Sequence, residues 1–326
     1  MIRILFAVAT LVFATAALPP TGADDPLPVI FDTDIQGDVD DVGALAVLHA
    51  LADRGEVKIL GMGVSALHPS SAPCLDAFNT FFGRPDVPIG VNKGDGFLRD
   101  SKYNEQIAAE FPHNLASTND APDAAQLYRK LLADADDQSV VIISVGQLSN
   151  LSTLLDTPPN QHSELNGSDL VHAKVRAWVC MGGKFPQGKE ANFYHHGPAA
   201  QHAVEHWPTP IVFSGFEIGH RVMTGAGLKA LPETNPVRRA YELFNGAQDH
   251  FSWDQTAVLF AARELDAPQG QFWDSEATGS CRIDADGTNR WDAETDRPHT
   301  YLVEKAPPAE VATVIEQLML SGASKK

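Results

Sequence analysis

The sequence predicts an α/β protein with an open, mostly parallel, Rossmann-like central sheet and helices on both faces. Short apolar runs alternate with helical patterns along the chain, which is typical of parallel strands joined by crossover helices. No internal repeat and no low-complexity linker divides the chain, so residues 24–326 are expected to form a single domain. A segment of about 300 residues can bury one large core without a second domain.

The first 23 residues are expected to be an export signal that takes no part in the fold. Arg3 supplies a positive charge, residues 4–18 are mostly apolar, and small residues at 14–16 or 22–23 offer a cleavage site. The apolar part, of about 15 residues, is short for a membrane span, and a retained N-terminal anchor is the alternative. The sequence therefore predicts a secreted or periplasmic protein with no membrane segment after signal cleavage.

Strands and helices are expected to alternate from residue 27 onward. Val42, Leu45 and His49 recur at helical spacing before Gly55, which predicts a helix after the first strand. Strands are expected at 27–31, 57–64, 87–91, 140–145, 176–181 and 210–214. Further helices are expected at 72–82, 121–133, 199–206, 253–263 and 308–320, and the stretch between the last two is expected to be irregular.

The net charge and the number of cysteines argue against one class of partner and two kinds of structural site. The chain has 24 Lys and Arg against 42 Asp and Glu, a net charge of −18, which argues against a nucleic acid polymer but not against a neutral nucleoside or sugar. Cys74, Cys180 and Cys281 are too few and too scattered for a disulfide framework or a zinc site, although one disulfide is compatible with export. Cys180 lies in an apolar run and is expected to be a core thiol.

Five aspartates follow the first predicted strand within ten residues. They are Asp32, Asp34, Asp38, Asp40 and Asp41. Carboxylates this close repel one another and destabilise a fold unless a cation or a polyol satisfies them. Because a buried strand delivers them to the carboxyl edge of the sheet, where open α/β folds bind ligands, the cluster predicts a site.

Two familiar types of aspartate-rich site fit these residues less well. A calcium loop of the EF-hand type would need Glu where Gly43 stands, and a helix before it instead of a strand. A haloacid-dehalogenase-like phosphatase would need Thr or Val in place of Gln36, and it has no role for three further aspartates. The acidic run 284–289 is expected to be a hairpin turn, since Thr295 stands where a calcium loop would need its last carboxylate.

Later strand ends add polar groups to the same edge. The strand at 140–145 leads into a tight turn, and the strand at 176–181 leads into a glycine-rich loop that ends at Glu190 and Asn192. The start of the helix expected at 253–263 adds Asp254, next to Trp253. Together with the aspartates, these groups are suited to a site that binds a hard cation and also a vicinal diol.

These motifs resemble those of a known family. DTDIQGDVDD, SVGQLSNL, MGGKF with EAN, and SWDQTAVL occur in the order and at the separations typical of inosine-uridine-preferring nucleoside hydrolases, over residues 28–263. The resemblance implies a calcium-dependent (Ca2+) hydrolase that cleaves the N-glycosidic bond of ribonucleosides to give ribose and free base. It also implies a small-molecule nucleoside as partner and allows a homo-oligomer, which is common in the family.

The resemblance also implies roles for single residues. The implied metal ligands are the side chains of Asp34, Asp41 and Asp254 and the main-chain carbonyl of Val145. Asp40 resembles the carboxylate that holds a ribose hydroxyl, and Glu190 and Asn192 resemble the pair that grips the remaining hydroxyls. In this hypothesis Asp34 also accepts a proton from the attacking water.

The residues expected to contact the leaving nucleobase, the base half of the site, depart from the family pattern. Many members carry a His directly before the last aspartate, where this chain has Trp253, and the loop 35–39 is longer and adds Asp38. His250 is the predicted acid for the leaving base, and Trp253 is predicted to stack on it or to belong to the core. His195 and His196 are alternative acids, although solvated loop histidines are the favoured interpretation.

Two aspartates are expected to have structural roles. Asp38 is expected to cap or charge-stabilise the helix start, and Asp32 to hold its loop through backbone amides. Because the base half is altered, hydrolysis of another riboside and non-catalytic calcium-dependent binding of a nucleoside or sugar stay open as alternatives.

Overall fold

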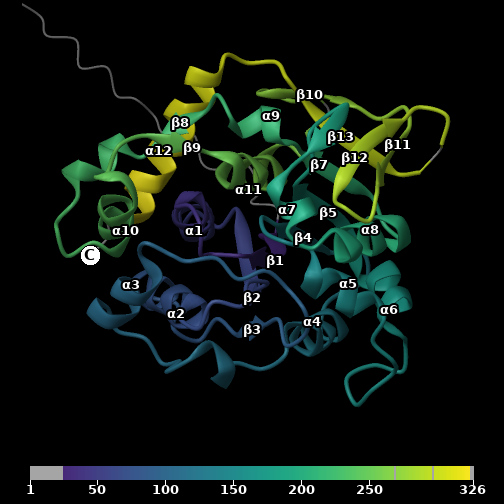
Figure 1. Cartoon of the computed structure of the whole chain (residues 1–326), viewed down its shortest axis with the longest axis horizontal. Coiled ribbons are helices and arrows are strands. Elements are labelled where there is room, and N and C mark those ends of the chain that lie inside the picture. Colours follow the sequence, from purple (N-terminus) through teal and green to yellow (C-terminus); the bar gives the residue numbers. More distant parts are fainter. Residues whose placement is uncertain (1–24, 268, 296, 324–326) are drawn as a thin grey trace, which may run out of the picture.

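The structure is a computed structural model that describes residues 25–267, 269–295 and 297–323. The predicted export signal at 1–23 lies outside these residues. An eight-stranded sheet runs through the middle of the molecule in the order β10-β13-β7-β5-β4-β1-β2-β3 (Figure 1). Every neighbouring pair is parallel except β10 with β13. The strands are β1 (Leu27–Thr33), β2 (Val57–Val64), β3 (Ile89–Val91), β4 (Val140–Ser144), β5 (Val175–Met181), β7 (Ile211–Ser214), β10 (Trp273–Glu276) and β13 (His299–Glu304).

Helices cover both faces of this sheet, as the sequence predicts. Val29 and Phe31 of β1 belong to one buried cluster, while Ile30 between them belongs to a second cluster on the other face. The first cluster is covered by α1 (Asp40–Asp53), α2 (Ser71–Phe81), α3 (Asn104–Glu110), α10 (Pro236–Asn245), α11 (Trp253–Arg263) and α12 (Pro308–Ala323). The second is covered by α4 (Ala124–Ala133), α5 (Ser149–Leu155), α6 (Gly167–Lys174) and α8 (Gly197–His206).

The strand order reverses direction at β1. The chain moves from β1 to β2 and β3 on one side, and then returns to β4, β5, β7 and β13 on the other side. The connections that leave β1 and β4 therefore diverge to opposite faces, which opens a crevice at the carboxyl ends of these two strands. The aspartate-rich loop that follows β1 lies in this position.

The C-terminal part departs from the prediction. The stretch before α12 is not irregular, because β13 extends the main sheet parallel to β7 and β10 pairs antiparallel at its edge. The strand β13 has no continuous apolar run, since only His299 and Leu302 in it are buried, so its sequence carries little strand signal. Helices α3, α6 and α10 are further elements that the sequence pattern did not predict.

The predicted hairpin turn at 284–289 is confirmed. It joins β11 (Ser280–Ile283) to β12 (Thr288–Asp292), and β6 (Gln187–Lys189) completes a small antiparallel sheet. Gly287 has φ 81° and donates its N–H to the carbonyl of Asp284 at 2.8 Å. Turn chemistry therefore explains this acidic run.

The three cysteines are all buried and free, and Cys180 lies in β5 as a core thiol. Within the described ranges, no helix has the length and hydropathy that crossing a membrane requires.

Candidate active site

A cavity of about 290 Å³ lies at the crevice between the ends of β1, β4 and β5. It collects all the predicted site residues except His250. Those that line it are Asp34, Asp40, Asp41, Val145, Glu190, Asn192, Trp253 and Asp254. Segments that are far apart in the sequence thus converge on one cavity, as the shared sheet edge predicts.

Three buried carboxylates lie close together in this cavity. Asp40 and Asp41 lie in the first turn of α1, and Asp254 lies in the first turn of α11. Each offers one oxygen within 4.8 Å of the others, and no side chain is more than 4 % exposed. Asp34 lines the same cavity beside them but is only half-buried.

The carboxylates of this group carry like charges and repel one another. Burial raises the pKa of Asp40, Asp41 and Asp254 well above its ordinary value, and the neighbouring carboxylates raise it further. Burial and the charges of Asp38 and Glu190 raise the pKa of Asp34 to about 8. A cation among these oxygens would offset both effects, and an all-oxygen donor set suits a hard divalent ion. The residues present therefore fit a metal site.

Two hydrogen-bond donors hold the carboxylate of Asp41 in place. The hydroxyl of Thr33 and the backbone N–H of Ile35, the latter at 3.1 Å, both donate to its Oδ1. Across the cavity, Asn192 donates its amide to the carbonyl of Val145 at 3.3 Å and to that of Met181 at 3.1 Å. Val145 lines the cavity at the position where the resemblance implies a main-chain ligand.

Glu190 occupies the N-cap of the short helix α7 (Ala191–Tyr194). Its two oxygens accept the N–H of Asn192 at 3.0 Å and the N–H of Gly183 at 2.9 Å. Gly183 has φ 78°, a conformation that favours glycine and that lets the loop turn back to this carboxylate. Burial raises the pKa of Glu190 to about 7, although these backbone hydrogen bonds oppose the shift.

Asp32 lies outside the cavity lining and ties β1 to the helices on the other face. Its Oδ2 accepts from the hydroxyl of Tyr128 in α4 and from the amide of Asn150 in α5, the latter at 2.8 Å. The expectation that backbone amides hold Asp32 is wrong, because the neighbouring helices bring side-chain donors to it instead. Burial raises the pKa of Asp32 to about 7.

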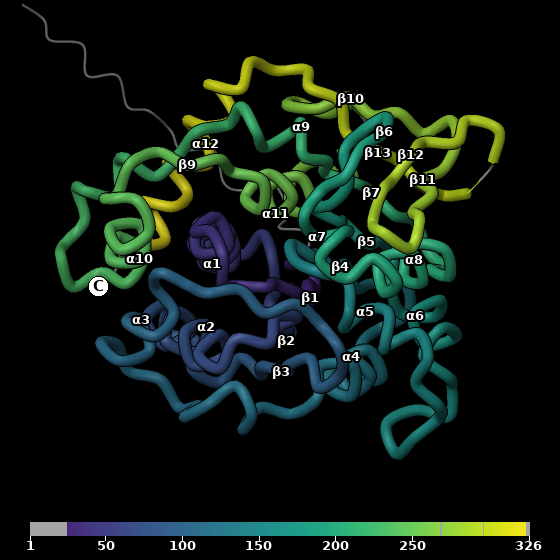
Figure 2. The backbone as a smooth tube through the Cα atoms, viewed as in Figure 1, coloured from purple at the N-terminus to yellow at the C-terminus, as the bar shows by residue number. Residues whose placement is uncertain are grey.

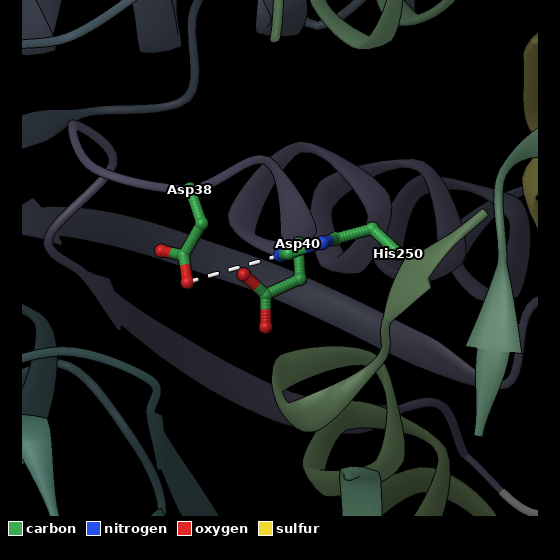
Figure 3. Close-up of side chains that lie close together, drawn as sticks. All are labelled: Asp38, Asp40 and His250. Atoms are coloured by element: carbon green, nitrogen blue, oxygen red, sulfur yellow. Dashed lines mark ion pairs between the residues drawn. The ribbon is translucent and has the colours of Figure 1, made fainter. Parts of the chain in front are cut away.

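His250 lies close to Asp38 and Asp40 (Figure 3), and the two aspartates line the cavity. His250, on the short strand β9 (His250–Phe251), places its Nε2 3.9 Å from Asp38 Oδ2 and is not part of the lining. Burial would raise the pKa of Asp38, but His250 and the charge of Arg99 outweigh burial and lower the pKa. The expected capping role of Asp38 is wrong, since Val39 is the N-cap of α1 and no side chain caps that helix.

The remaining wall is aromatic and basic. Trp253 lines the cavity and packs on Phe216 of α9 (Phe216–Gly219), with ring centroids 5.3 Å apart, and its Nε1 donates to the Phe216 carbonyl at 2.8 Å. His195 also lines the cavity instead of lying solvated in a loop, and its ring stacks on Phe97 at 3.8 Å. His196 bonds instead to the hydroxyl of Ser149 at 2.8 Å.

Several lining residues carry no signal in the sequence. They are Arg99, Lys189, Tyr194 and Phe216. Each lies in a loop or in the short segments next to one, where neither periodicity nor spacing distinguishes a cavity side chain from a solvated one. Only the fold brings them to the mouth of the acidic cavity.

Comparison with known proteins supports the same relationship. A family model described as inosine-uridine preferring nucleoside hydrolase matches residues 29–316. The pyrimidine-specific ribonucleoside hydrolase RihA of Salmonella agona (strain SL483) is 28 % identical over 214 residues, which cover 61 % of this chain and 63 % of that protein. The match thus spans a little under two thirds of the relative's length.

Two solved structures share the fold. The inosine-uridine preferring nucleoside hydrolase from Bacillus anthracis has a TM-score of 0.68 and 13 % identity, and the match covers 90 % of this chain and 99 % of that one. The purine-preferring ribonucleoside hydrolase from Gardnerella vaginalis has a TM-score of 0.67 and 14 % identity, covering 91 % and 99 %. Since the family model matches nearly the whole described chain, the protein belongs to the inosine-uridine preferring nucleoside hydrolase family.

Proposed function

We propose that the protein is a calcium-dependent hydrolase that cleaves the N-glycosidic bond of ribonucleosides to give ribose and free base. The observation that carries this proposal is the convergence of Asp40, Asp41 and Asp254 with the Val145 carbonyl in one cavity of about 290 Å³. Family membership supports the reaction class, and the geometry supports the assignment of parts.

The ligands of the ion would be Asp34, Asp41, Asp254 and the carbonyl of Val145. Asp40 lies close enough to Asp41 and Asp254 to serve both the ion and a sugar hydroxyl. A bound calcium ion would lower the pKa of a water molecule and fix the sugar diol. The hard oxygen donors of this ligand set favour calcium over zinc. An imidazole is nevertheless close by, because His250 forms a second group with Asp38 and Asp40 whose ligand atoms lie within 4.8 Å of one another.

The protein's own groups would bind the sugar and move the proton. Asp40, Glu190 and Asn192 line the cavity as acceptors and donors for hydroxyl groups. Asp34, which is less buried than the other carboxylates, would accept a proton from the attacking water. The water oxygen then bonds to the anomeric carbon while the bond to the base nitrogen breaks. Carboxylates beside the sugar stabilise the positive charge that develops there.

The leaving base would lie against the packed rings of Trp253 and Phe216, in the cavity that Tyr194 also lines. Aromatic rings suit the flat face of a purine or a pyrimidine. The named relatives differ in their base preference, one being pyrimidine-specific and another purine-preferring. The proposed substrate class is therefore ribonucleosides, without a choice of base.

A panel of purine and pyrimidine ribonucleosides tests the proposal. The full chain is incubated with each nucleoside, with calcium or with a chelator, and released reducing sugar is measured. We expect release with calcium, loss with chelator and recovery when calcium is added back. No release from any riboside, with calcium and nucleoside still bound, would show a binding protein instead.

Two variants sharpen this test. Asp254→Asn should lose about 100-fold or more in activity and bind calcium more weakly. Asp284→Asn is the matched control, because Asp284 is an exposed carboxylate that pairs with Arg290 in the hairpin and should leave both properties unchanged. An Asp34→Ala protein with full turnover would overturn the assignment of Asp34 as the base.

A further inference from the structure

The segment between β3 and α3 folds against the aspartate loop and carries Arg99 to the cavity. The backbone N–H of Arg99 donates to Gln36 Oε1 at 3.0 Å, and that of Phe97 donates to Gln147 Oε1 at 2.8 Å. Both amide side chains are buried, at 1 % and 0 % exposure. Buried polar anchors of this kind fix the position of a loop, so Arg99 starts from a defined backbone site.

Gly37 makes room for the Arg99 side chain. A Cβ at Gly37 would lie 2.7 Å from Arg99 Nη1 and 3.0 Å from its Cδ. Gly37 does not have a positive φ, so its backbone conformation does not require glycine, and a side chain there would meet only the flexible side chain of Arg99. The longer loop 35–39, which distinguishes this chain from the family pattern, thus contacts Arg99 twice. Gln36 accepts its backbone N–H, and Gly37 leaves space for its side chain.

The side chain of Arg99 is exposed, and its charge lowers the pKa of Asp38 and opposes the rise in the pKa of Asp34, but the guanidinium has no bonded partner among the residues that the structure describes. It makes no ion pair and no hydrogen bond with any residue in those ranges, although Asp34 and Asp38 line the same cavity. The other cation of the lining, Lys189, pairs with Asp286 at 3.0 Å. A guanidinium carries five N–H donors and stays protonated, so Arg99 offers a fixed positive charge to whatever enters the cavity.

The neighbouring imidazole does not offer the same charge. Burial and the charge of Arg99 lower the pKa of His195 to about 4, so its ring is neutral at neutral pH. His250 lies beside Asp38, outside the lining. Within the described part of the chain, Arg99 is therefore the cation without an ion pair in the cavity that Trp253 and Phe216 also line.

We propose that Arg99 binds the leaving group and stabilises the negative charge that develops on it, with Gln36 and Gly37 as positioning residues. This inference rests on the proposed hydrolase function. As the C–N bond breaks, its electron pair passes to the base, and the water oxygen bonds to the anomeric carbon. The proton released from water reaches the base through Asp34 or solvent, so the guanidinium transfers no proton. The favoured ligands are ribosides whose leaving group presents a carbonyl or anionic oxygen to Arg99.

A comparison of two leaving groups tests this role. Uridine and inosine release a poor leaving group, whereas 4-nitrophenyl β-D-ribofuranoside releases a phenolate that needs little help from the protein. For Arg99→Met we expect kcat to fall about 100-fold on the nucleosides, the effect of losing one preorganised stabilising group, with a much smaller loss on the nitrophenyl riboside. Arg99→Lys should recover part of the nucleoside activity because it keeps the charge.

The control is Lys93→Met in the same segment, since Lys93 is exposed and bonds only to the Asn119 carbonyl at 3.0 Å. It should behave like the wild type. An equal loss on both substrates in Arg99→Met, or no loss on either, would overturn the role of Arg99 while leaving the hydrolase function intact. Wild-type turnover of the nitrophenyl riboside alone would also overturn it, and no wild-type turnover of any riboside would overturn the proposed function itself.

Gly37→Ala tests the space next to Gly37 that the Arg99 side chain occupies, and it keeps the positive charge of Arg99. The added methyl group meets the flexible end of Arg99, so the side chain moves and the fold should keep its melting temperature. We expect the same selective loss on nucleosides, and no further loss when Gly37→Ala is combined with Arg99→Met. Losses that multiply in the double variant would show that Gly37 acts independently of Arg99.

Discussion

Asp41 illustrates how single residues prepare a carboxylate for a cation. Thr33 and Ile35 both donate to its Oδ1, which fixes the side chain while Oδ2 is available to a ligand. Thr33 is the last residue of β1, so the strand itself orients the carboxylate at the start of α1. Supporting hydrogen bonds of this kind tune metal affinity as well as geometry.

Thr33→Val keeps the shape of the side chain and removes the hydroxyl donor. We expect the calcium Kd to rise about 10- to 100-fold, with kcat at saturating calcium changed much less. Calorimetric titration of the chelated protein measures the affinity. Thr300→Val, on β13 and away from the cavity, is the control, and an unchanged Kd for Thr33→Val would show that Asp41 needs no such support.

At the scale of elements, α1 links the cavity to the core. It is buried almost all round, from Asp40 to Leu51, because α11 and α12 both pack against it. Figure 2 shows α12, at the end of the described chain, beside the purple α1 near its beginning. A Cβ at Gly322 would lie 2.8 Å from the Ala46 carbonyl, so the two helices approach closely.

Leu318→Ala tests the stabilisation that α12 provides. Leu318 is 1 % exposed in the core cluster that includes α1, and its truncation should lower the free energy of unfolding by about 2–5 kcal/mol. Denaturant unfolding measures this change. Leu165→Ala is the matched control, since Leu165 is 40 % exposed and should change stability by no more than about 0.5 kcal/mol. Equal effects of the two variants would mean that α12 is not part of the cooperative core.

At the scale of the whole molecule, acidic side chains gather in one buried cavity, and this couples the stability of the protein to pH. The raised pKa of about 7 for Asp32 and Glu190, and of about 8 for Asp34, means that the calcium-free folded state holds protons that the unfolded state releases. Their stabilising contribution is complete below about pH 4, the unfolded pKa, and is lost as the pH rises through about 7 to 8.

We therefore expect the melting temperature of the chelated protein to fall between pH 5 and pH 8. Saturating calcium should raise it more at pH 8 than at pH 5, because the ion competes with protons for the same oxygens. Differential scanning calorimetry with and without calcium measures both effects. A calcium shift that is the same at the two pH values would contradict a site built from these carboxylates.

The predictable part of the fold consists of elements whose patterns are local. The apolar runs of β1 and β4 identify buried parallel strands, and the aspartates that follow β1 identify the edge where a ligand binds. The pairing of β13 with β7 could not be predicted in this way, because β13 is only partly buried and its partner lies far away in the sequence.

The sequence by itself determined the α/β class, the carboxylate cluster and its place at a strand end, because periodicity and charge spacing act over a few residues. Only the tertiary structure decided that Asp40 joins Asp41 and Asp254, that His250 lies beside Asp38, and which loop side chains line the cavity. Arg99 depends on Gln36 and Gly37, more than sixty residues earlier in the chain. Contacts between such distant segments form only when the whole sheet and its helices have packed, so no local pattern records them.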